Sequence, residues 1–477
     1  MTLWIFSAVY LVVQCLAVAS AVHALFTVRT AQGTVAWVIG LLAVPWLALP
    51  LYWVFGCRRF GAHARVMSQK QAVYQTEIQA VLDRLAPYQV TRKDLVPADA
   101  AAFAELAGQE FLRGNTLRLL IDGDETFDAI IAEIEQAKHS VYVQFYIMRN
   151  DGLGNRLLEA MAAKAAQGVE ACFLFDMFGG AAMTKEVQEK WRRRGVQMAA
   201  FCSTSSGRDR WRGNFRNHRK NVIVDGRVGF VGGHNVGDEY LGLDPKFGRW
   251  RDTHVRVEGP TALQLQRSFA ADWYFVTDRV VDRSWVPHDP EPDAAGQRAL
   301  VLDSGPSDDF ERCTLFFLHA IGMAKSRIWI ASPYFVPDEG VLQALQLAAV
   351  RGVEVRVLLP QKADHLFVWL ASFNLLKELD HPNMFIHRFT GGFLHHKALV
   401  VDDHFAAVGT ANFDNRSFRL NFEITLAVAD KKFAGEVAVM FERDFAESML
   451  VDAMAYHDLP FHWKLGAKIS RLLAPIL

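Results

Sequence analysis

The sequence has little net charge and few cysteines. Its 51 Lys and Arg residues nearly balance 52 Asp and Glu, so the formal net charge is −1. No overall basic field of the kind found in nucleic-acid-binding proteins is present. The five cysteines are scattered and form no CxxC pair. We therefore expect no disulfide framework and no zinc site, and a reducing compartment is favoured.

Long uncharged apolar runs are missing from most of the chain, and the two clearest lie close together at its start. Residues 3–26 and 35–55 are each about 20 residues or longer, enough to cross a hydrocarbon core of roughly 30 Å. A polar turn over 29–34 separates them. We predict a transmembrane helical hairpin within residues 1–60. A cleaved signal peptide is the alternative, but no basic segment precedes the first run, and the second follows at once.

Positive charges are unevenly placed around these two runs. Arg29 alone lies between them, whereas Arg58, Arg59, Arg65 and Lys70 follow the second run. Basic residues are retained on the cytoplasmic side of a membrane. We therefore expect a multi-pass protein with its large C-terminal part in the cytoplasm.

The rest of the chain contains an internal repeat. AKHSVYVQFYI is similar to AKSRIWIASPYF, and AAQGVEACFLF is similar to AVRGVEVRVLL. Strand patterns alternate with helix patterns in both copies, which predicts an α/β fold. We expect two similar lobes, each a mostly parallel mixed sheet flanked by helices. The predicted boundaries are a connecting helix and linker over 61–116, the first lobe over 117–285, a linker over 286–300, the second lobe over 301–460 and a tail over 461–477.

The tail combines Trp463, Lys464 and Lys468 with apolar residues at helical spacing. A basic amphipathic helix of this kind suits an anionic membrane surface. Plain packing on the body of the protein is the other interpretation.

One short motif occurs once in each half. His218, Lys220 and Asp225 fit HxKxxxxD, and so do His395, Lys397 and Asp402. A GxxN element follows each copy and ends at Asn235 or Asn412. The offset is constant, because 395 − 218 and 412 − 235 both equal 177. A lone match could arise by chance, but two copies at one spacing inside a wider repeat indicate a functional site.

The spacing of the motif has a structural meaning. Apolar residues after each lysine predict a buried strand, and residues two apart on a strand point to the same face. Each histidine should therefore share a surface with its lysine, which suits an anionic phosphate. Asp225 and Asp402 lie further on, where the chain is expected to turn. Both a direct chemical role and a turn or packing role remain open for these two aspartates.

Two histidines can take separate roles in phosphoryl transfer. A neutral imidazole can attack phosphorus, while a second protonates the leaving alcohol and deprotonates the incoming one. The lysines of the two motifs, with Asn235 and Asn412, would stabilise charge on the phosphate oxygens. This chemistry requires neither a metal nor another cofactor.

Acidic side chains are needed to hold the far nitrogen of each imidazole. Asp252 and Glu423 follow the two histidines by 34 and 28 residues and begin later strands. We take them as histidine-orienting candidates, with charges on edge strands as the alternative.

The paired HxKxxxxD and GxxN elements resemble those of the phospholipase D superfamily. The resemblance implies that two lobes meet across a pseudo-twofold axis to form one site. It also implies a phosphohistidine intermediate on His218, with His395 as acid and base. The residue pattern by itself does not decide which histidine is the nucleophile.

Longer segments resemble bacterial cardiolipin synthases over nearly the whole chain. These segments are PLYWVFG, NHRKNVIVDGRVGFVGGHNVGDEY, WRDTHVRVEGP, SPYFVPD and FLHHKALVVDDHFAAVGTANFDNRSFRLNFE. Two local departures are His396 and Thr410, where that family more often has a small residue and a serine. The resemblance implies an inner-membrane enzyme that joins two phosphatidylglycerols into cardiolipin and releases glycerol.

The resemblance implies phospholipid and the bilayer as partners and leaves a homo-oligomer open. The neutral net charge and the predicted membrane hairpin argue against nucleic acid as a partner. Hydrolysis of phospholipids to phosphatidic acid is the alternative activity, followed by cleavage of other phosphodiesters. Phosphatidylethanolamine remains open as a donor.

Three further residues are weaker candidates for substrate binding. Tyr146 and Tyr334 end matching strands of the repeat, and Arg416 follows the second GxxN element. Packing roles for the tyrosines and a loop salt bridge for the arginine are the alternatives. His234, His254 and His396 follow the strand pattern and do not have the spacing of a metal-ligand set.

Overall fold

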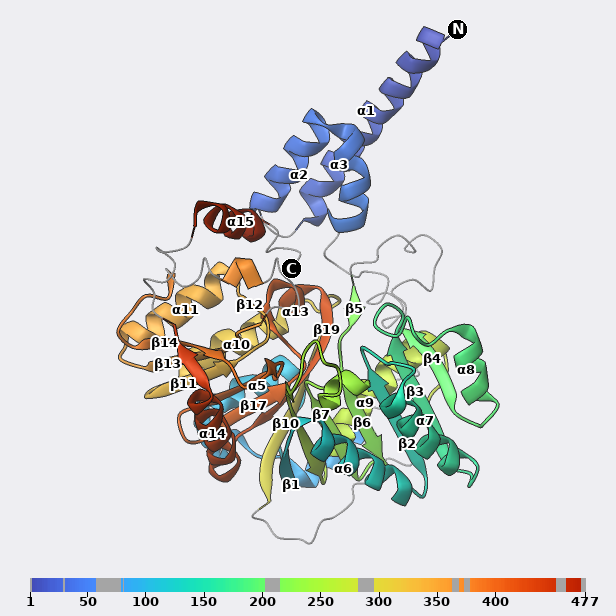
Figure 1. Ribbon diagram of the computed structural model, residues 1–477, viewed down its shortest axis with the longest axis vertical. Helices are drawn as coiled ribbons and strands as arrows, with labels where there is room; N and C mark the ends of the chain where they lie inside the picture. The colour runs from blue at the N-terminus through green and yellow to red at the C-terminus, as the bar shows by residue number, and fades with distance from the viewer. Residues whose placement is uncertain are drawn as a thin grey trace.

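One mixed sheet of 16 strands runs through the body of the protein. The computed structural model describes residues 2–28, 31–56, 79, 81–201, 215–281, 296–362, 369–372, 378–451 and 460–472. Figure 1 shows the sheet between layers of helices, with the N-terminal helices projecting from one end of the body. The predicted α/β class is confirmed.

The two halves of the sheet repeat one strand order, read outward from the central pair β1 and β10. The first half runs β1 (Leu112–Ile121), β9 (Thr253–Glu258), β7 (Val228–Gly232), β6 (Asn221–Val224), β2 (Ser140–Phe145), β3 (Glu170–Asp176) and β4 (Gln197–Phe201). The second runs β10 (Gln297–Ser304), β19 (Asn421–Val428), β17 (Phe405–Gly409), β16 (Ala398–Val401), β11 (Arg327–Ala331), β13 (Glu354–Pro360), β14 (Met384–Phe389) and β20 (Ser448–Leu450).

The prediction of mostly parallel sheets is wrong. In the first half, β2–β3 and β3–β4 are parallel, whereas β1–β9, β9–β7, β7–β6 and β6–β2 are antiparallel. Each histidine motif forms the first strand of a tight hairpin, which places an antiparallel pair inside the sheet. The two halves also form one continuous sheet, because β1 pairs with β10, with Leu112 opposite Ala299.

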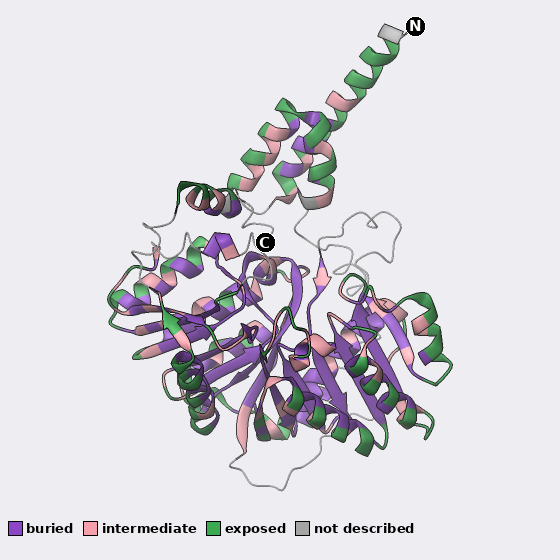
Figure 2. Cartoon of the chain, in the orientation of Figure 1, coloured by how far each residue is buried: buried purple, intermediate pink, exposed green. Residues whose placement is uncertain are grey.

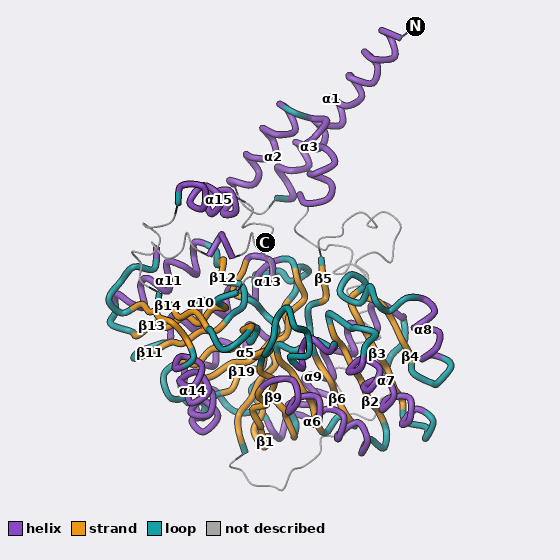
Figure 3. The backbone as a smooth tube through the Cα atoms, viewed as in Figure 1, coloured by secondary structure: helices purple, strands orange, loops and turns teal. Residues whose placement is uncertain are grey.

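Helices cover both faces of the sheet. Helices α9 (Thr261–Thr277) and α14 (Lys431–Ala446) share one apolar core, which spans both halves. The opposite face carries α6 (Asp122–Gln136) and α7 (Gly152–Ala165) in the first half, and α10 (Arg312–Met323) and α11 (Glu339–Val350) in the second. Figure 2 shows the strands between these layers almost wholly buried, and Figure 3 separates the strands from the helices by colour.

The sequence explains where these helices begin and which side they bury. On α6, Phe127, Ile130 and Ile134 are buried at spacings of three and four, and acidic residues occupy its first turn. Helices α7, α11 and α14 each begin after an aspartate whose side chain accepts a hydrogen bond from a backbone N–H in the first turn. The shorter helices are α5 (Ala101–Ala107), α8 (Lys185–Arg192) and α13 (Asn415–Arg419).

The N-terminal apolar region contains α1 (Thr2–Thr27), α2 (Ala31–Ala43) and α3 (Pro45–Leu51), followed by a π-helical turn over Tyr52–Gly56. Among the described residues, only Trp4–Thr27 is long and apolar enough to cross a membrane as one helix. The apolar run over 35–55 is divided between α2, α3 and the π-helical turn, so a second membrane span stays a prediction. Pro45 has no N–H and disfavours helical geometry at the residue before it, and Val44 accordingly has φ −137° and ψ 62°.

Several sequence predictions fall outside the described residues. They concern residues 61–78 and 80 of the connecting helix and linker, the basic residues Arg58, Arg59, Arg65 and Lys70, and the part of the linker over 286–295. The tail forms α15 (Phe461–Leu472), which confirms its predicted helical structure.

Candidate active site

The two histidine motifs lie at one edge of the sheet. β6 runs antiparallel to β2, with Asn221 opposite Gln144, and β16 runs antiparallel to β11, with Ala398 opposite Ala331. Both motif strands therefore begin beside the carboxyl ends of the parallel strands. His218 and His395 precede them and lie at that same edge.

Backbone hydrogen bonds tie each motif to the other half of the chain. The His218 N–H donates to the carbonyl of Phe422 at 2.9 Å, next to the short pairing of β5 (Arg216–Asn217) with β19. The His395 N–H donates to the carbonyl of Arg251 at 2.8 Å, next to the pairing of β15 (Phe393–Leu394) with β8 (Trp250–Arg251). The two halves are thus interlocked at the histidines.

The His218 imidazole contacts a carboxylate from the second half. Its Nδ1 lies 2.9 Å from Oε2 of Glu423 and 3.0 Å from Oε1. Glu423 is buried and accepts two more hydrogen bonds, from the Thr410 hydroxyl at 2.6 Å and from the Asn421 amide at 3.1 Å. These donors fix the carboxylate, so the ring presents its other nitrogen, Nε2, away from Glu423.

The His395 imidazole contacts a carboxylate from the first half. Its Nδ1 lies 2.7 Å from Oδ2 of Asp252, whose Oδ1 accepts the Thr253 N–H at 2.8 Å. The Lys397 ammonium lies 2.9 Å from Nδ1 and 3.0 Å from Nε2 of the same ring. Asp252 and Glu423 therefore each contact a motif histidine, and in both pairs that histidine belongs to the opposite half of the chain.

Burial gives the two pairs distinct electrostatics. Burial lowers the pKa of His218 to about 4, even though the Glu423 carboxylate acts in the opposite sense. Burial also disfavours ionisation of Glu423, but His218 and Lys220 outweigh it and hold the pKa of Glu423 below its usual value. The pair at neutral pH is thus an ionised carboxylate and a neutral imidazole.

Charges from the two motifs act on one another. Lys397 of the second motif contributes to lowering the pKa of His218, and it opposes protonation of Lys220. Burial is the main reason that the pKa of Lys220 lies well below its usual value. Burial also opposes ionisation of Asp252, but His234, Lys397 and His395 outweigh it and hold the pKa of Asp252 well below its usual range. The two motifs therefore share one electrostatic environment.

The two asparagines differ in their partners. Asn235 accepts the Ile147 N–H at 3.1 Å and donates to the Tyr240 hydroxyl at 3.2 Å. Asn412 is buried, and within the described part of the chain its side-chain oxygen has no hydrogen-bond partner. Among the described residues, Asn412 is thus the one of the two amides whose oxygen is buried without a hydrogen-bond partner.

Asp225 and Asp402 occupy turns and face backbone amides. Asp225 accepts hydrogen bonds of 2.8 Å from the N–H groups of residues 138, 139 and 140, directly before β2. Asp402 binds the N–H groups of residues 325–327 in the same way before β11. Both have positive φ, 53° and 49°, at the far end of the motif strand. This geometry supports the turn role for both aspartates, and a direct chemical role for either stays a prediction.

The three weaker candidates fall in different places. The Tyr146 ring lies edge-on to His218, with centroids 5.0 Å apart, and the Lys220 ammonium is 5.5 Å from that ring. Burial raises the pKa of Tyr146, and the positive charge of Arg416 opposes this rise. Tyr334 is half-buried, and its carbonyl accepts the Ser332 hydroxyl at 2.6 Å. Tyr146 is thus the best supported of the three as a neighbour of a histidine.

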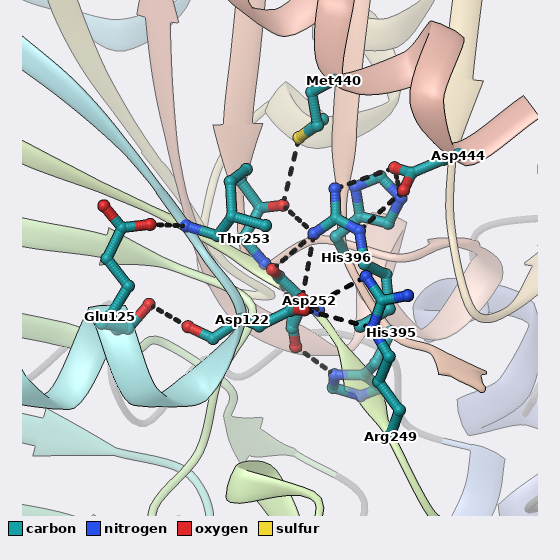
Figure 4. Close-up of polar contacts among 12 residues, drawn as sticks. Asp122, Glu125, Arg249, Asp252, Thr253, His395, His396, Met440 and Asp444 are labelled. Carbon is teal, nitrogen blue, oxygen red and sulfur yellow. Dashed lines mark hydrogen bonds and ion pairs between the residues drawn. The ribbon is translucent and has the colours of Figure 1, made fainter. Parts of the chain in front are cut away.

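A buried ionic cluster behind Asp252 was not anticipated from the sequence. Arg251 donates to both carboxylate oxygens of Asp444 at 2.7 and 2.8 Å, and its Nη1 lies 3.2 Å from Oδ1 of Asp122. His396 points away from the site, 3.5 Å from Asp444. Figure 4 shows Asp122, Asp252, His395, His396 and Asp444 gathered in one group of polar contacts. The only available signal was the position of Arg251 beside Asp252 in the WRDTH segment.

A cavity of about 660 Å³ adjoins this cluster. β1, Arg249, Arg251 and one side of α14 line it, and no predicted site residue does. Its position beyond Asp444 separates it from the histidine pairs. Among the described residues, no group of three His, Cys, Asp or Glu side chains is arranged to hold a metal ion.

Comparison with known proteins agrees with this architecture. Residues 130–273 and 317–445 match the family described as "Cardiolipin synthase, PLD-like domain", and residues 15–56 match "Phospholipase_D-nuclease N-terminal". The chain is 44% identical over 469 residues to Cardiolipin synthase A of Pseudomonas putida (strain GB-1), covering 98% of this chain and 97% of that one.

A second relative and one solved structure extend the comparison. Cardiolipin synthase A of Pseudomonas aeruginosa (strain LESB58) is 43% identical over 474 residues, covering 98% of this chain and 95% of that one. The crystal structure of phosphatidylserine synthase from Haemophilus influenzae Rd KW20 superposes with a TM-score of 0.60 at 13% identity, over 80% of this chain and all of that one. Identity over nearly the full length, together with two matched domains, shows that the chain belongs to the cardiolipin synthase family of phospholipase D-like proteins.

Proposed function

We propose that the protein is a cardiolipin synthase, which transfers a phosphatidyl group from one phosphatidylglycerol to another and releases glycerol. One observation supports this most directly. Two histidines from distant parts of the chain each contact a buried carboxylate from the opposite half, at 2.9 and 2.7 Å, in a chain 44% identical to Cardiolipin synthase A.

In the first step of the proposed mechanism, Nε2 of His218 attacks the phosphorus of the donor lipid. A P–N bond forms, and the bond from phosphorus to the headgroup glycerol oxygen breaks. His395 gives its proton to that oxygen, and glycerol leaves. A neutral His218 is what this step requires, and burial lowers its pKa to about 4, so the attacking lone pair is free at neutral pH.

In the second step, His395 accepts the proton from a headgroup hydroxyl of the second phosphatidylglycerol. That oxygen attacks phosphorus, a P–O bond forms, the P–N bond breaks and neutral His218 is restored. Glu423 and Asp252 keep the two rings oriented and stabilise them when charged. His395 ends each cycle in the protonation state in which it began.

Lysine and amide groups stabilise the negative oxygens of the transition state. Burial lowers the pKa of Lys220, and an entering phosphate would raise it again by offering an opposite charge. Lys397 and Asn412 lie in the second half, so both halves contribute donors. A site closed to water around the lipid favours an alcohol as acceptor over hydrolysis.

The membrane arrangement is part of the proposal. α1 crosses the bilayer, and residues 31–56 return through it as the broken helical segment α2–α3, with the catalytic body on the cytoplasmic side. The Tyr52 hydroxyl lies 2.6 Å from Nδ1 of His23, and the Trp53 indole donates to the Ser20 hydroxyl at 3.2 Å, which supports α1 and the returning segment as one unit. The repeated strand order around β1 and β10 supports a pseudo-twofold relation between the two halves.

The test is product analysis with the purified full-length protein in phosphatidylglycerol vesicles. Mass spectrometry should detect cardiolipin and glycerol in equal amounts, and both His218→Ala and His395→Ala should abolish them. Phosphatidic acid as the main product would instead establish a hydrolase. Cleavage of labelled DNA without lipid turnover would establish a nuclease, and full activity in both variants would refute the two-histidine mechanism.

A further inference from the structure

We propose that the edge of the body that carries the histidines docks onto an anionic bilayer surface, with α15 lying in the interface and its apolar face among the acyl chains. This inference rests on the proposed membrane function and specifies how the soluble body meets the lipid. Two separate surfaces, one on each half of the protein, support it.

The first surface is one face of α15. Phe461, Leu465 and Ile469 follow one another at intervals of four residues and are 79%, 46% and 50% exposed. The other side of the helix is packed, because Ala467 and Ser470 are buried. An amphipathic helix that packs on one side and exposes large apolar groups on the other is typical of interfacial segments.

Contacts place α15 at the same edge of the sheet as the histidines. The Trp463 ring lies 5.6 Å from that of Trp369, and Ser372 in the same short segment accepts a hydrogen bond from Arg388 of β14 at 2.9 Å. Arg388 in turn donates to the carbonyl of Pro360, the last residue of β13. Residues 369–372, which contact α15, therefore lie at the carboxyl ends of β13 and β14. His395 lies at the same edge of the sheet.

The second surface lies on the first half, after β3. Met177 and Phe178 are large apolar residues that are about half exposed, at 47% and 54%. The preceding Asp176 accepts the Asn217 N–H at 2.9 Å, one residue before His218. The Arg216 guanidinium lies 3.6 Å from the Phe178 ring centroid. Exposed apolar groups thus lie beside the first histidine as well.

Charge and position identify the bilayer as the partner of these surfaces. Lys464 and Lys468 on α15 and Arg216 beside Phe178 carry positive charge, which favours anionic headgroups. Figure 1 shows α15 beyond the same end of the body as α1 and α2. Exposed apolar side chains cover α1, including Trp4, Phe6 and Leu11. A membrane that holds α1 would thus contact the edge of the body that carries the histidines, and not the opposite edge.

Depth measurements on the full-length protein in nanodiscs of phosphatidylglycerol and phosphatidylcholine test this arrangement. A fluorophore is attached at Leu465→Cys or Ile469→Cys in a background without the native cysteines, and quenching by acyl-chain spin labels is recorded. The matched control is Val350→Cys at the end of α11, which is 69% exposed and directly precedes β13, at the opposite edge. A probe at Val12→Cys on α1 reports membrane insertion itself.

We expect strong quenching at positions 465, 469 and 12 and none at 350. Quenching at 12 but not at 465 or 469 would overturn the docking proposal and leave α1 as the membrane helix. Absence of quenching at 12 would refute insertion of α1, on which the proposed function relies. Probes at 465 and 469 that are shielded from water without lipid quenching would indicate a second protein copy on this face, and would also overturn the proposal.

An activity measurement complements the depth measurement. Phe461→Ser, Leu465→Ser and Ile469→Ser combined should lower cardiolipin formation roughly threefold to tenfold, because the body would meet the lipid less often. Val350→Ser should leave the rate unchanged. Equal rates for the triple variant and the control would contradict a role of α15 in presenting the site to lipid.

Discussion

Asp252 and His395 lie 143 positions apart in the sequence, yet their side chains approach to 2.7 Å. Glu423 and His218 form the reciprocal pair across 205 positions. Each half of the protein therefore supplies the carboxylate for the histidine of the other. Neither half holds a complete site by itself, which makes the interlocked backbone contacts at residues 218 and 395 part of the active-site architecture.

Removing the charge of Asp252 should impair chemistry without removing the side chain. In Asp252→Asn, the Nδ1–H of His395 loses its anionic acceptor, so the imidazolium that forms during turnover is less stable and the ring is less well oriented. We expect the rate of cardiolipin formation to fall by about 10²–10⁴-fold. Rates in phosphatidylglycerol vesicles, with thermal unfolding as a control for folding, provide the measurement. A variant as active as the parent would show that Asp252 does not serve His395.

Replacing Asp225 should lower stability and leave turnover intact, unlike replacing Asp252. Its carboxylate accepts three backbone N–H groups at 2.8 Å, and Asp225→Asn weakens this set while tolerating the positive φ. We expect a loss of about 1–3 kcal/mol in unfolding free energy, with turnover per folded molecule unchanged. Denaturant unfolding and activity of the same preparation decide this. A large loss of turnover at full stability would instead establish a direct chemical role for Asp225.

The acidic limb of the pH–rate profile should lie at low pH. His218 must be neutral to attack, and its pKa is lowered to about 4, so activity should be lost only as the pH falls through that region, well below the usual histidine value. Glu423 raises the pKa of His218, so Glu423→Gln should move the limb to still lower pH while slowing the maximal rate. The measurement is kcat/KM against pH. A limb near pH 6.5 would contradict a neutral, buried nucleophile.

Gly233 offers a steric test of the Asp252–His395 pair. A Cβ at Gly233 would lie 2.0 Å from Oδ1 of Asp252, so Gly233→Ala must displace that carboxylate. We expect a loss of about 10²-fold in rate, the scale of a displacement of about 1 Å in an active site. Gly435→Ala on α14 is the matched control, because no described atom outside its own stretch of helix lies within 4 Å of its Cβ position. Equal rates in the two variants would show that the exact position of Asp252 does not matter.

Patterns along the chain were sufficient for the fold class and the motif residues. The repeated segments identified in the sequence contain matching strands, β2 and β3 in the first half and β11 and β13 in the second. The constant offset of 177 between the two motifs identified His218 and His395 together. These features depend on local periodicity and on spacing, which a sequence displays directly.

Other features depend on neighbours that are distant in sequence. Antiparallel pairing within each half and the joining of β1 to β10 departed from the expected arrangement. The contacts of the Asp225 carboxylate with the amides before β2 likewise depend on the tertiary structure. Strand pairing is chosen by burial and hydrogen bonding across the whole sheet, so short apolar runs do not specify it.

By itself, the sequence determined which side chains are available for chemistry: two histidines, two lysines, and acids able to orient the rings. Only the tertiary structure decided that Asp252 serves His395 and Glu423 serves His218. The physical reason is that a hydrogen bond requires approach to about 3 Å, and the crossed backbone pairings β5–β19 and β8–β15 bring opposite halves to that distance.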